Sequence, residues 1–481
     1  MHSALSNLPV AVIGAGPIGL AAAAHLHSRG FTPLILEAGA TAAAGLKTYE
    51  HVQLFSPWRY NIDKAAKQLL EQHGWRSPDP EVLPTAGELV RSYLQPLAAL
   101  PALAPQLYLS HRVVSIARAN IDKVKTSQRE AAPFALRVTA PDGEREFLAQ
   151  AVIDASGTWS QPNPVGASGV PALGESALAG RIAYGMPDIL GAQRTCYAGK
   201  RVLVLGSGHS AAGNLLALAK LAESSPTTQM VWAIRGENWT KILGGGEADG
   251  LPARGQLGQR VRQLRDGGRL QVHTSFRVHE LRSDKGRITV YGAGQDAARP
   301  HIGGIEEIIA ATGSRPDLAM TRELRLKLDH WLESTEALAP LIDPNEHSCG
   351  TVRPHGHREL AHPEAGYYAV GAKSYGRAPT FLMATGYEQV RSIAAALAGD
   401  LVAANDVQLD LPETGVCSVN FGPVGKQTPA IRAESCCGGP ASKTSEACCA
   451  ADEQAKKAGA AGCGCSPPVL DAEPKPRACC G

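Results

Sequence analysis

The stretch that decides the fold is "VAVIGAGPIGL", Val10 to Leu20. Its first four residues form a short apolar run rich in β-branched side chains, and the residues after Gly19 are rich in alanine, which favours a helix. A second apolar run, "TPLILE", follows and ends on an acid at Glu37. The order therefore predicts a strand, a glycine turn, a helix and a second strand.

The turn has the spacing of a dinucleotide-binding loop. Gly14, Gly16 and Gly19 follow the pattern G-x-G-x-x-G, and Pro17 lies within it. The first glycine permits a tight turn, the second lets the backbone approach a pyrophosphate, and the third lets the helix pack on the strand. Glu37 follows at the distance expected of an acid that bonds a ribose hydroxyl. This unit is predicted to bind a dinucleotide.

A second unit begins at Arg201 with "RVLVLGSGHSAAGNLLALAKL". Gly206 and Gly208 form its turn, and Ser210 follows them at the start of the expected helix. Its next strand ends at Arg235, where the first unit has its acid. An arginine suits the 2′-phosphate of NADPH, whereas an acid suits a free 2′-hydroxyl; the alternative is a solvated arginine at a strand end. Two such units predict FAD on the first and NADPH on the second.

Two further stretches run from an apolar strand into a turn of small residues. They are "AVIDASGTWSQPNP", Ala151 to Pro164, and "EIIAATGSRPDL", Glu307 to Leu318. Small residues let the backbone come close to a ligand or to another chain segment. The candidate cofactor contacts here are Gly157, Thr158, Thr312 and Gly313. Both stretches flank the second unit, which suggests an NADPH domain inserted into an FAD domain.

The predicted fold class is α/β, with two Rossmann-like domains and a flexible tail. The expected boundaries are 1–165 for the first part of the FAD domain, 166–305 for the NADPH domain, 306–405 for the second part of the FAD domain, and 406–481 for the tail. Gly371 precedes a loop and a helix expected from about Gly386 to Leu397, and its backbone is a further flavin contact. Trp58 is another candidate to line the flavin, with a purely structural aromatic as the alternative.

The composition of the chain excludes few classes of protein. The chain of 481 residues is 44% hydrophobic and 19% charged, with a net charge of +2, which argues neither for nor against nucleic acid. We expect neither nucleic acid nor membrane as a partner, since no run of about 18 apolar residues and no signal peptide are recognisable. The expected location is the cytoplasm, and the oligomeric state stays open.

The motifs "VIGAGPIGL", "DASGTWSQPNP", "VLVLGSGHSA" and "IAATGSRPD", in this order, resemble those of the FAD- and NADPH-dependent flavin monooxygenases. The likeness covers roughly residues 8 to 405 and is closest to the flavoprotein oxygenases of bacterial arsenic-resistance operons, through "YGMPDILG", "GSGHSA" and the cysteine-bearing end. The family pattern F-x-G-x-x-x-H-x-x-x-[YFW] is incomplete here. In "LAGRIAYGMPD" only Gly180 of that pattern is kept, which puts the usual organic substrates in doubt.

Pyridine-nucleotide disulfide and mercuric reductases are the other similar family. They carry a redox cysteine pair on the helix after the first acidic strand, but this chain has no cysteine between Glu37 and Cys196. A disulfide relay is therefore not expected.

The last sixty residues hold eight of the eleven cysteines: Cys436, Cys437, Cys448, Cys449, Cys463, Cys465, Cys479 and Cys480. Four interpretations stay open: disulfides, a zinc site, capture of a soft metalloid by thiolates, or a dispensable tail. Adjacent cysteines form strained disulfides, and zinc knuckles need C-x-x-C spacing, whereas soft ions select sulfur. Capture of As(III), Sb(III) or Hg(II) is the leading hypothesis. Cys349, with histidines nearby in sequence, is a further candidate for a substrate site.

The resemblance implies an NADPH-dependent FAD monooxygenase that uses molecular oxygen and oxidises trivalent arsenicals or related metalloids in detoxification. The alternatives are oxygenation of an organic nitrogen, sulfur or ketone substrate, a metal or disulfide reductase, and a metalloid carrier that has lost its chemistry. No catalytic acid or base is assigned, because a trivalent arsenical is itself a soft nucleophile.

Overall fold

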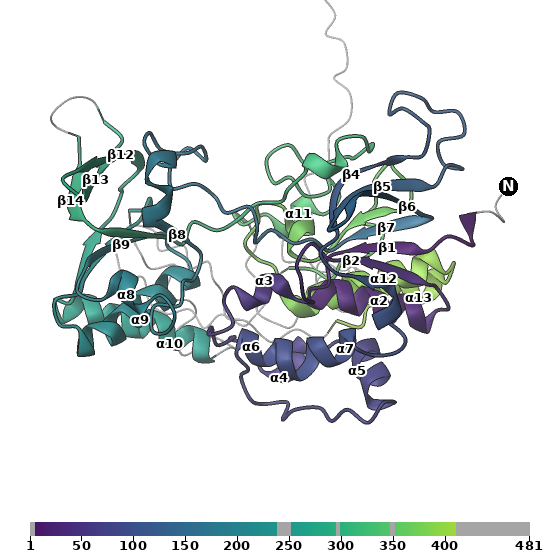
Figure 1. Cartoon of the computed structure of the whole chain (residues 1–481), viewed down its shortest axis with the longest axis horizontal. Coiled ribbons are helices and arrows are strands. Elements are labelled where there is room, and N and C mark those ends of the chain that lie inside the picture. Colours follow the sequence, from purple (N-terminus) through teal and green to yellow (C-terminus); the bar gives the residue numbers. More distant parts are fainter. Residues whose placement is uncertain (1–4, 238–251, 295–298, 347–351, 410–481) are drawn as a thin grey trace, which may run out of the picture.

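The computed structural model describes residues 5–237, 252–294, 299–346 and 352–409. The chain forms two lobes joined by two adjacent linkers (Figure 1). Each lobe is built on a parallel sheet of five strands, and each carries a smaller antiparallel sheet of three strands. The predicted α/β class with two Rossmann-like domains is therefore confirmed.

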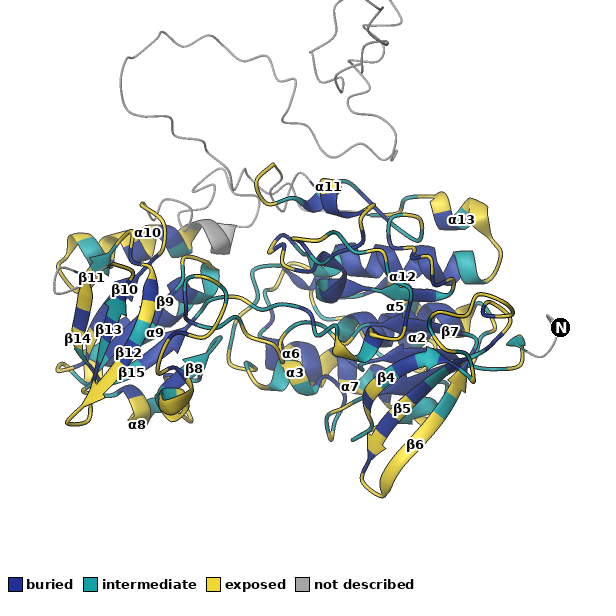
Figure 2. Cartoon of the chain, turned by 90° about the horizontal axis from the view of Figure 1, so that it is seen from above, coloured by how far each residue is buried: buried dark blue, intermediate teal, exposed yellow. Residues whose placement is uncertain are grey.

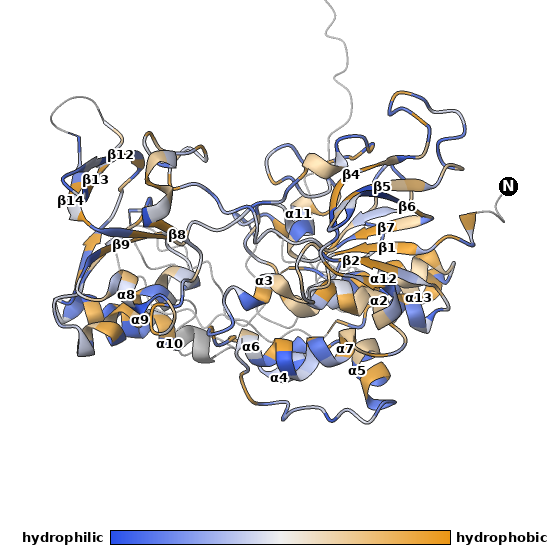
Figure 3. Cartoon of the chain, in the orientation of Figure 1, coloured by the Kyte–Doolittle hydropathy of each residue, from blue (hydrophilic) through white to orange (hydrophobic). Residues whose placement is uncertain are grey.

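The first parallel sheet forms the centre of the first lobe. Its strand order is β16 (Tyr367–Ala369), β7 (Ala151–Asp154), β1 (Val10–Ile13), β2 (Pro33–Leu36) and β3 (Leu107–Tyr108). The strands β1, β2 and β7 are strongly hydrophobic, as Figure 3 shows. A strand that is buried on both faces needs such a continuous apolar sequence. The alternation expected of a half-buried strand is accordingly absent from these three.

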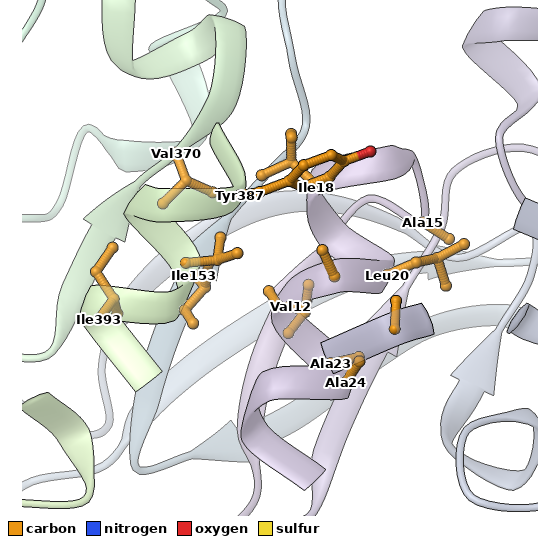
Figure 4. Packing of buried hydrophobic residues seen from close by; sticks show 14 of the residues in the cluster. Val12, Ala15, Ile18, Leu20, Ala23, Ala24, Ile153, Val370, Tyr387 and Ile393 are labelled. Carbon is orange, nitrogen blue, oxygen red and sulfur yellow. The ribbon is translucent and has the colours of Figure 1, made fainter. Parts of the chain in front are cut away.

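Helix α2 (Pro17–Ser28) and helix α12 (Met383–Leu397) pack together against this sheet. Their shared core includes Val12, Ile18, Ile153 and Tyr387, seen in Figure 4. Helix α12 begins at Met383, a few residues before the start expected near Gly386. The remaining helices of the lobe are α3 (Ala44–Lys47), α4 (Trp58–Asn61), α5 (Lys64–Glu71), α6 (Ala86–Leu89), α7 (Gln95–Ala98), α11 (Ala339–Ile342) and α13 (Leu401–Asn405).

An antiparallel sheet connects β3 to β7 and lies on the first lobe. Its strands are β4 (Arg112–Arg118), β5 (Phe134–Ala140) and β6 (Gly143–Ala149). The strand β6 is mostly exposed, whereas β5 alternates between buried and exposed residues (Figure 2). This is the pattern of a sheet with one face on the core and one in solvent.

The second lobe repeats the plan. Its parallel sheet has the order β11 (Leu270–His273), β10 (Gln229–Ala233), β9 (Arg201–Leu205), β15 (Glu307–Ala310) and β8 (Ile182–Tyr184). Its helices are α8 (Arg194–Tyr197), α9 (His209–Ser224) and α10 (Pro252–Asp266). The antiparallel strands are β12 (Val278–Asp284), β13 (Arg287–Gly292) and β14 (His301–Ile305).

The second lobe extends further along the chain than expected. The boundary expected between residues 305 and 306 falls before β15, but β15 pairs in parallel with β9 and β8. The second sheet therefore includes residues up to Ala310, and the return to the first lobe begins after it. The tail from 410 onward, with all eight of its clustered cysteines, lies outside the described residues.

The two linkers between the lobes bind each other. Asn163 and Gly313 share a backbone hydrogen bond of 2.9 Å, the Asn163 side-chain amide donates to the Thr312 carbonyl at 3.1 Å, and the Thr312 hydroxyl donates to the Asn163 carbonyl at 2.6 Å. The Ser314 hydroxyl donates to the Thr158 hydroxyl at 2.8 Å. The small-residue turns predicted from the sequence thus hold the two linkers side by side. No helix within the described ranges is both long and apolar enough to span a membrane.

Candidate active site

The first glycine turn is held by close backbone contacts. Gly14 has a φ of 95°, and a Cβ atom at this position would lie 2.8 Å from the Ala155 carbonyl oxygen. A Cβ atom at Gly19 would lie 1.9 Å from the Gly14 carbonyl oxygen. Gly16 differs, because no heavy atom lies within 4 Å of its Cβ position. Two glycines therefore permit packing inside the protein, and the third leaves a space beside the turn.

The end of α2 beside that space suits a pyrophosphate. Gly16 is the N-cap residue and Pro17 the first residue of the helix, where its missing amide hydrogen costs nothing. No side chain caps this terminus and no acid lies in its first turn, so the amides and the helix dipole face an incoming anion. The open Gly16 position and this uncapped terminus fit the diphosphate of FAD.

Glu37 follows β2 and binds the turn itself. One carboxylate oxygen accepts from the Ala15 amide at 2.7 Å, and the other accepts from the Gly39 amide at 2.7 Å. Each carboxylate oxygen keeps a further lone pair, so the ribose hydroxyls expected here have acceptors available. Glu37 thus orients the loop through two backbone hydrogen bonds, in addition to its expected hydrogen bond with a ribose hydroxyl.

The second glycine turn repeats the first. Gly206 has a φ of 121°, and a Cβ atom there would lie 2.1 Å from the Ala311 carbonyl oxygen. Gly208 precedes α9 with no side-chain cap and no heavy atom near its Cβ position. Ser210 lies in the first turn of α9. Arg235 is exposed, and its guanidinium donates only a long hydrogen bond of 3.3 Å to the Ala167 carbonyl among its described contacts. The geometry fits a dinucleotide whose 2′-phosphate meets an exposed cation.

A cleft of about 740 Å³ lies between the two lobes. The first lobe contributes residues 51–56, Tyr60, Pro379 and residues 381–384. The second lobe contributes residues 186–190 together with side chains of α9 and α10. His209 and Ser210 of the second glycine turn line it. The rings of Phe55 and His209 meet edge to face across the cleft with centroids 5.5 Å apart. The cleft therefore reaches the second nucleotide motif from the first lobe.

A buried ion pair lies directly behind the first motif. The Lys373 ammonium is 2.5 Å from the Asp154 carboxylate, and both side chains are at most 1% exposed. The Tyr367 hydroxyl donates to the same carboxylate oxygen at 3.0 Å, and the Ser156 hydroxyl donates to the other at 2.6 Å. Burial, with the Asp154 charge as the second cause, raises the pKa of Tyr367 well above its usual range. Asp154 adjoins Ala155, whose carbonyl supports the first glycine turn, so the pair fixes that support.

Gly371 belongs to a second buried network. Its φ is 67°, and its amide donates to the Gln389 side-chain oxygen at 2.8 Å. The Gln389 amide nitrogen in turn lies 2.9 Å from both the Ser374 hydroxyl and the His355 ring. Burial lowers the pKa of His355, which keeps the ring neutral in this network. The Gly371 amide is thus engaged within the protein, and its flavin contact stays a prediction.

Five other predicted contacts lie in the core of the first lobe or in the linkers. Trp58 is 4% exposed and packs in the hydrophobic core of the first lobe, which favours the structural alternative. Thr158 and Thr312 have their hydroxyls engaged between the linkers. Gly157 and Gly313 both have positive φ, at 69° and 81°, which the linker turns require. Cofactor contacts for these residues stay predictions.

The sequence reasoning missed several residues at the site. Asp154 and Met186 lie within motifs that were recognised, "DASGTWSQPNP" and "YGMPDILG", so a signal was present without an assigned role. Met186 packs on α9, because a Cβ atom at Gly213 would lie 2.8 Å from its terminal methyl. Lys373 carries no sequence signal, since a lysine in a polar-looking loop is normally exposed.

Metal ligands are not gathered among the described residues, where no group of three or more His, Cys, Asp or Glu side chains is placed to hold an ion. The described cysteine, Cys196, is exposed on α8 and does not line the cleft. Cys349 and the tail cysteines lie outside the described residues.

The two parallel sheets and their paired glycine turns have the plan of FAD- and NAD(P)-binding Rossmann-like domains. Residues 11–351 match the model of the family described as pyridine nucleotide-disulphide oxidoreductase, which is more than half of the chain. The chain belongs to this family, and it is an oxidoreductase with a flavoprotein fold. No curated protein matches the sequence.

Solved structures share the fold at low sequence identity. The bacillithiol disulfide reductase Bdr (YpdA) from Bacillus cereus is 18% identical, with 82% of this chain and 99% of that chain covered and a TM-score of 0.59. The FAD-bound cadaverine monooxygenase DfoA from Erwinia amylovora is 14% identical, covering 88% and 99%, with a TM-score of 0.56. A flavin monooxygenase from Stenotrophomonas maltophilia, as a double mutant, is 22% identical, covering 82% and 98%, with a TM-score of 0.51. Both monooxygenases and disulfide reductases therefore use this fold.

Proposed function

We propose that the protein is an NADPH-dependent FAD monooxygenase that oxidises trivalent arsenicals or related metalloids in detoxification. The observation that carries the oxygenase proposal is a cleft between the two lobes that reaches the second nucleotide motif and has no thiol among its described lining residues. A disulfide reductase that works through protein thiols needs a cysteine pair beside the flavin. The whole segment from Glu37 to Arg194 contains none.

The residues of the chain would divide the work as follows. The N-terminus of α2 and Glu37 hold FAD, while the N-terminus of α9, Ser210 and Arg235 hold NADPH. A bound flavin supplies hydride acceptance from NADPH and activation of oxygen. The cleft walls orient the substrate and exclude water, and the substrate lone pair requires no acid or base from the protein.

The reaction balances without another reductant. NADPH, a proton, O₂ and the trivalent arsenical give NADP⁺, water and the pentavalent arsenical. One oxygen atom forms a bond to arsenic, which loses two electrons, and the other leaves as water with the hydride and the proton. The tail thiolates, outside the described residues, are proposed to gather the metalloid and raise its local concentration.

The test is NADPH consumption by the purified holoenzyme in air with methylarsenite or arsenite. The proposal predicts consumption above the basal rate, matched by formation of the pentavalent product. An unchanged rate with both substrates would sink the arsenical assignment. Deleting residues 422–481 should raise KM more than it lowers kcat, if the tail only gathers substrate.

An organic substrate is the second candidate, supported by the shared fold of the cadaverine monooxygenase. An uncharged thioether or an amine would then couple NADPH oxidation to product, whereas an arsenical would only release hydrogen peroxide. Hydrogen peroxide measured against NADPH consumed separates these two assignments.

A further inference from the structure

The described walls of the cleft are predominantly apolar. Phe55, Leu190, Phe381, Leu382 and Met383 line it together with Met186, and each is at least partly exposed to solvent in the structure. Met186 lies against α9 of the second lobe, and Met383 is the first residue of α12 in the first lobe. The two thioethers thus come from opposite lobes. Thioether sulfur is soft and polarisable, and it adapts to irregular apolar ligands.

The carboxylate in the cleft is already occupied. Among the described lining residues only Asp188 carries a carboxylate. One of its oxygens accepts from the Gly191 amide at 2.9 Å, and the other accepts from the Ala192 amide at 2.8 Å. The carboxylate also packs closely on its own loop, because a Cβ atom at Gly191 would lie 2.3 Å from one of its oxygens. Both of its oxygens are therefore engaged in closing this loop, and each keeps one further lone pair.

The cation in the cleft belongs to the nucleotide side. Arg260 is exposed on α10, and this helix packs beside α9, whose first turn carries Ser210. A phosphate of NADPH at the α9 terminus complements an arginine placed there. The remaining basic groups of the described lining are His51 and His209.

We propose that the cleft selects uncharged, apolar or soft substrates and rejects cationic amines, with Met186, Met383, Phe55 and Phe381 as its selective wall. An ammonium group entering this cleft would lose its hydration and find, among the described residues, only the Asp188 carboxylate, whose two oxygens already accept backbone amides; this exchange is costly. An uncharged arsenical or thioether loses little on entry. The inference deepens the proposed oxygenase function and rests on it for the identity of the site.

The test compares two probes of similar size and opposite character, methyl phenyl sulfide and benzylamine, at pH 8. Calorimetric titration of the holoenzyme with NADP⁺ present measures their binding without turnover. We expect the sulfide to bind at least ~10-fold more tightly than the amine. Desolvating the ammonium group should cost at least the free energy that corresponds to a tenfold difference in affinity. Equal affinities, a tighter amine, or failure of the sulfide to bind would each overturn the inference.

The variant Leu190→Asp supplies a second carboxylate at a side chain that is already 47% exposed, so the fold tolerates it. It should weaken sulfide binding and strengthen benzylamine binding, each by ~10-fold, through one new charge pair. Val170→Asp is the matched control, because Val170 is 62% exposed and does not line the cleft. Unchanged selectivity in Leu190→Asp, or the same change in Val170→Asp, would contradict the assignment.

Arsenical oxidation is measured separately. A failure of the proposed arsenical function can then be told apart from a failure of the proposed selectivity. If sulfide binds selectively and methylarsenite is not oxidised, the arsenical function fails and the selectivity stands. If methylarsenite is oxidised and benzylamine binds as tightly as sulfide, the selectivity fails and the function stands.

Discussion

The two glycine motifs of this protein have the same backbone plan and differ in how completely the protein fixes them. In the first, Glu37 binds two loop amides and the Asp154–Lys373 pair supports the adjacent strand end. In the second, Arg235 is exposed and makes only one long hydrogen bond among the described contacts. A preformed site suits a cofactor that stays bound, and an open one suits a cosubstrate that must leave after every turnover. The comparison teaches that similar motifs acquire different roles from what surrounds them.

The largest difference between the two glycine motifs should come from breaking the Asp154–Lys373 ion pair. Among the described residues, the second motif has no such pair beside it. Asp154→Asn leaves Lys373 buried without its counter-charge, and breaking such a pair costs about 3–5 kcal/mol. We expect lower flavin content and a lower free energy of unfolding, measured by urea titration. The double variant Asp154→Asn, Lys373→Met removes both charges and should recover much of the loss. A single variant as stable as the parent would show that the pair does not support the first motif.

Acid should weaken the first lobe more than the second. Burial lowers the pKa of His362 to about 4, and burial also lowers the pKa values of His355 and His357 in the same lobe and of His273 in the other. A pKa lowered by folding gives stability above the unfolded value of about 6.5 that is lost as pH falls toward the folded value.

For His362 alone this loss is on the order of 3 kcal/mol between pH 7 and pH 4. Hydrogen exchange at pH 7 and pH 5 should therefore show greater loss of protection in β1 than in β9, after correction for intrinsic rates. His362→Gln should reduce this difference. A greater loss in β9 would reverse the comparison.

Gly19 and Gly213 should respond differently to substitution by alanine, which adds one methyl group. At Gly19 the added carbon meets the backbone oxygen of Gly14, which cannot move away, so Gly19→Ala should cost about 1–3 kcal/mol and reduce FAD binding. At Gly213 it meets only the flexible end of Met186, so Gly213→Ala should cost less than about 1 kcal/mol. Melting temperature and flavin content test both variants. Equal costs would remove the distinction between the two turns.

The smallest expected effect concerns the second motif alone. Arg235→Ala should raise KM for NADPH by ~10-fold or more, because an exposed arginine–phosphate contact contributes about 1.5–3 kcal/mol. The KM for NADH and the flavin content should not change. Steady-state kinetics with both nucleotides measure this, and Arg287→Ala, at an exposed arginine outside the cleft lining, is the control. An equal effect on NADH would contradict recognition of the 2′-phosphate.

The fold class followed from the sequence because its signals are local. A glycine turn, the helix after it and the acid that ends the next strand all lie within thirty residues. The boundary near residue 306 was misplaced because only sheet pairing shows that β15 lies beside β9. The small antiparallel sheets were not foreseen, since their half-buried strands give weaker patterns.

The site was predictable in part for a similar reason. The turns around Gly14 and Gly206 are where the sequence placed them, but Asp154 and Lys373 are 219 residues apart and meet only in the folded chain. Met186 and Gly213 likewise come together through packing between a loop and α9. Long-range contacts of this kind leave no pattern in a single sequence.

The most direct test of the central claim is an anaerobic titration of the purified protein with NADPH. The account predicts that FAD remains bound through gel filtration, that NADPH bleaches its absorbance at one equivalent, and that Arg235→Ala slows bleaching without releasing flavin. A preparation that holds no flavin after supplementation with FAD, or bound flavin that neither NADPH nor NADH reduces, would contradict it.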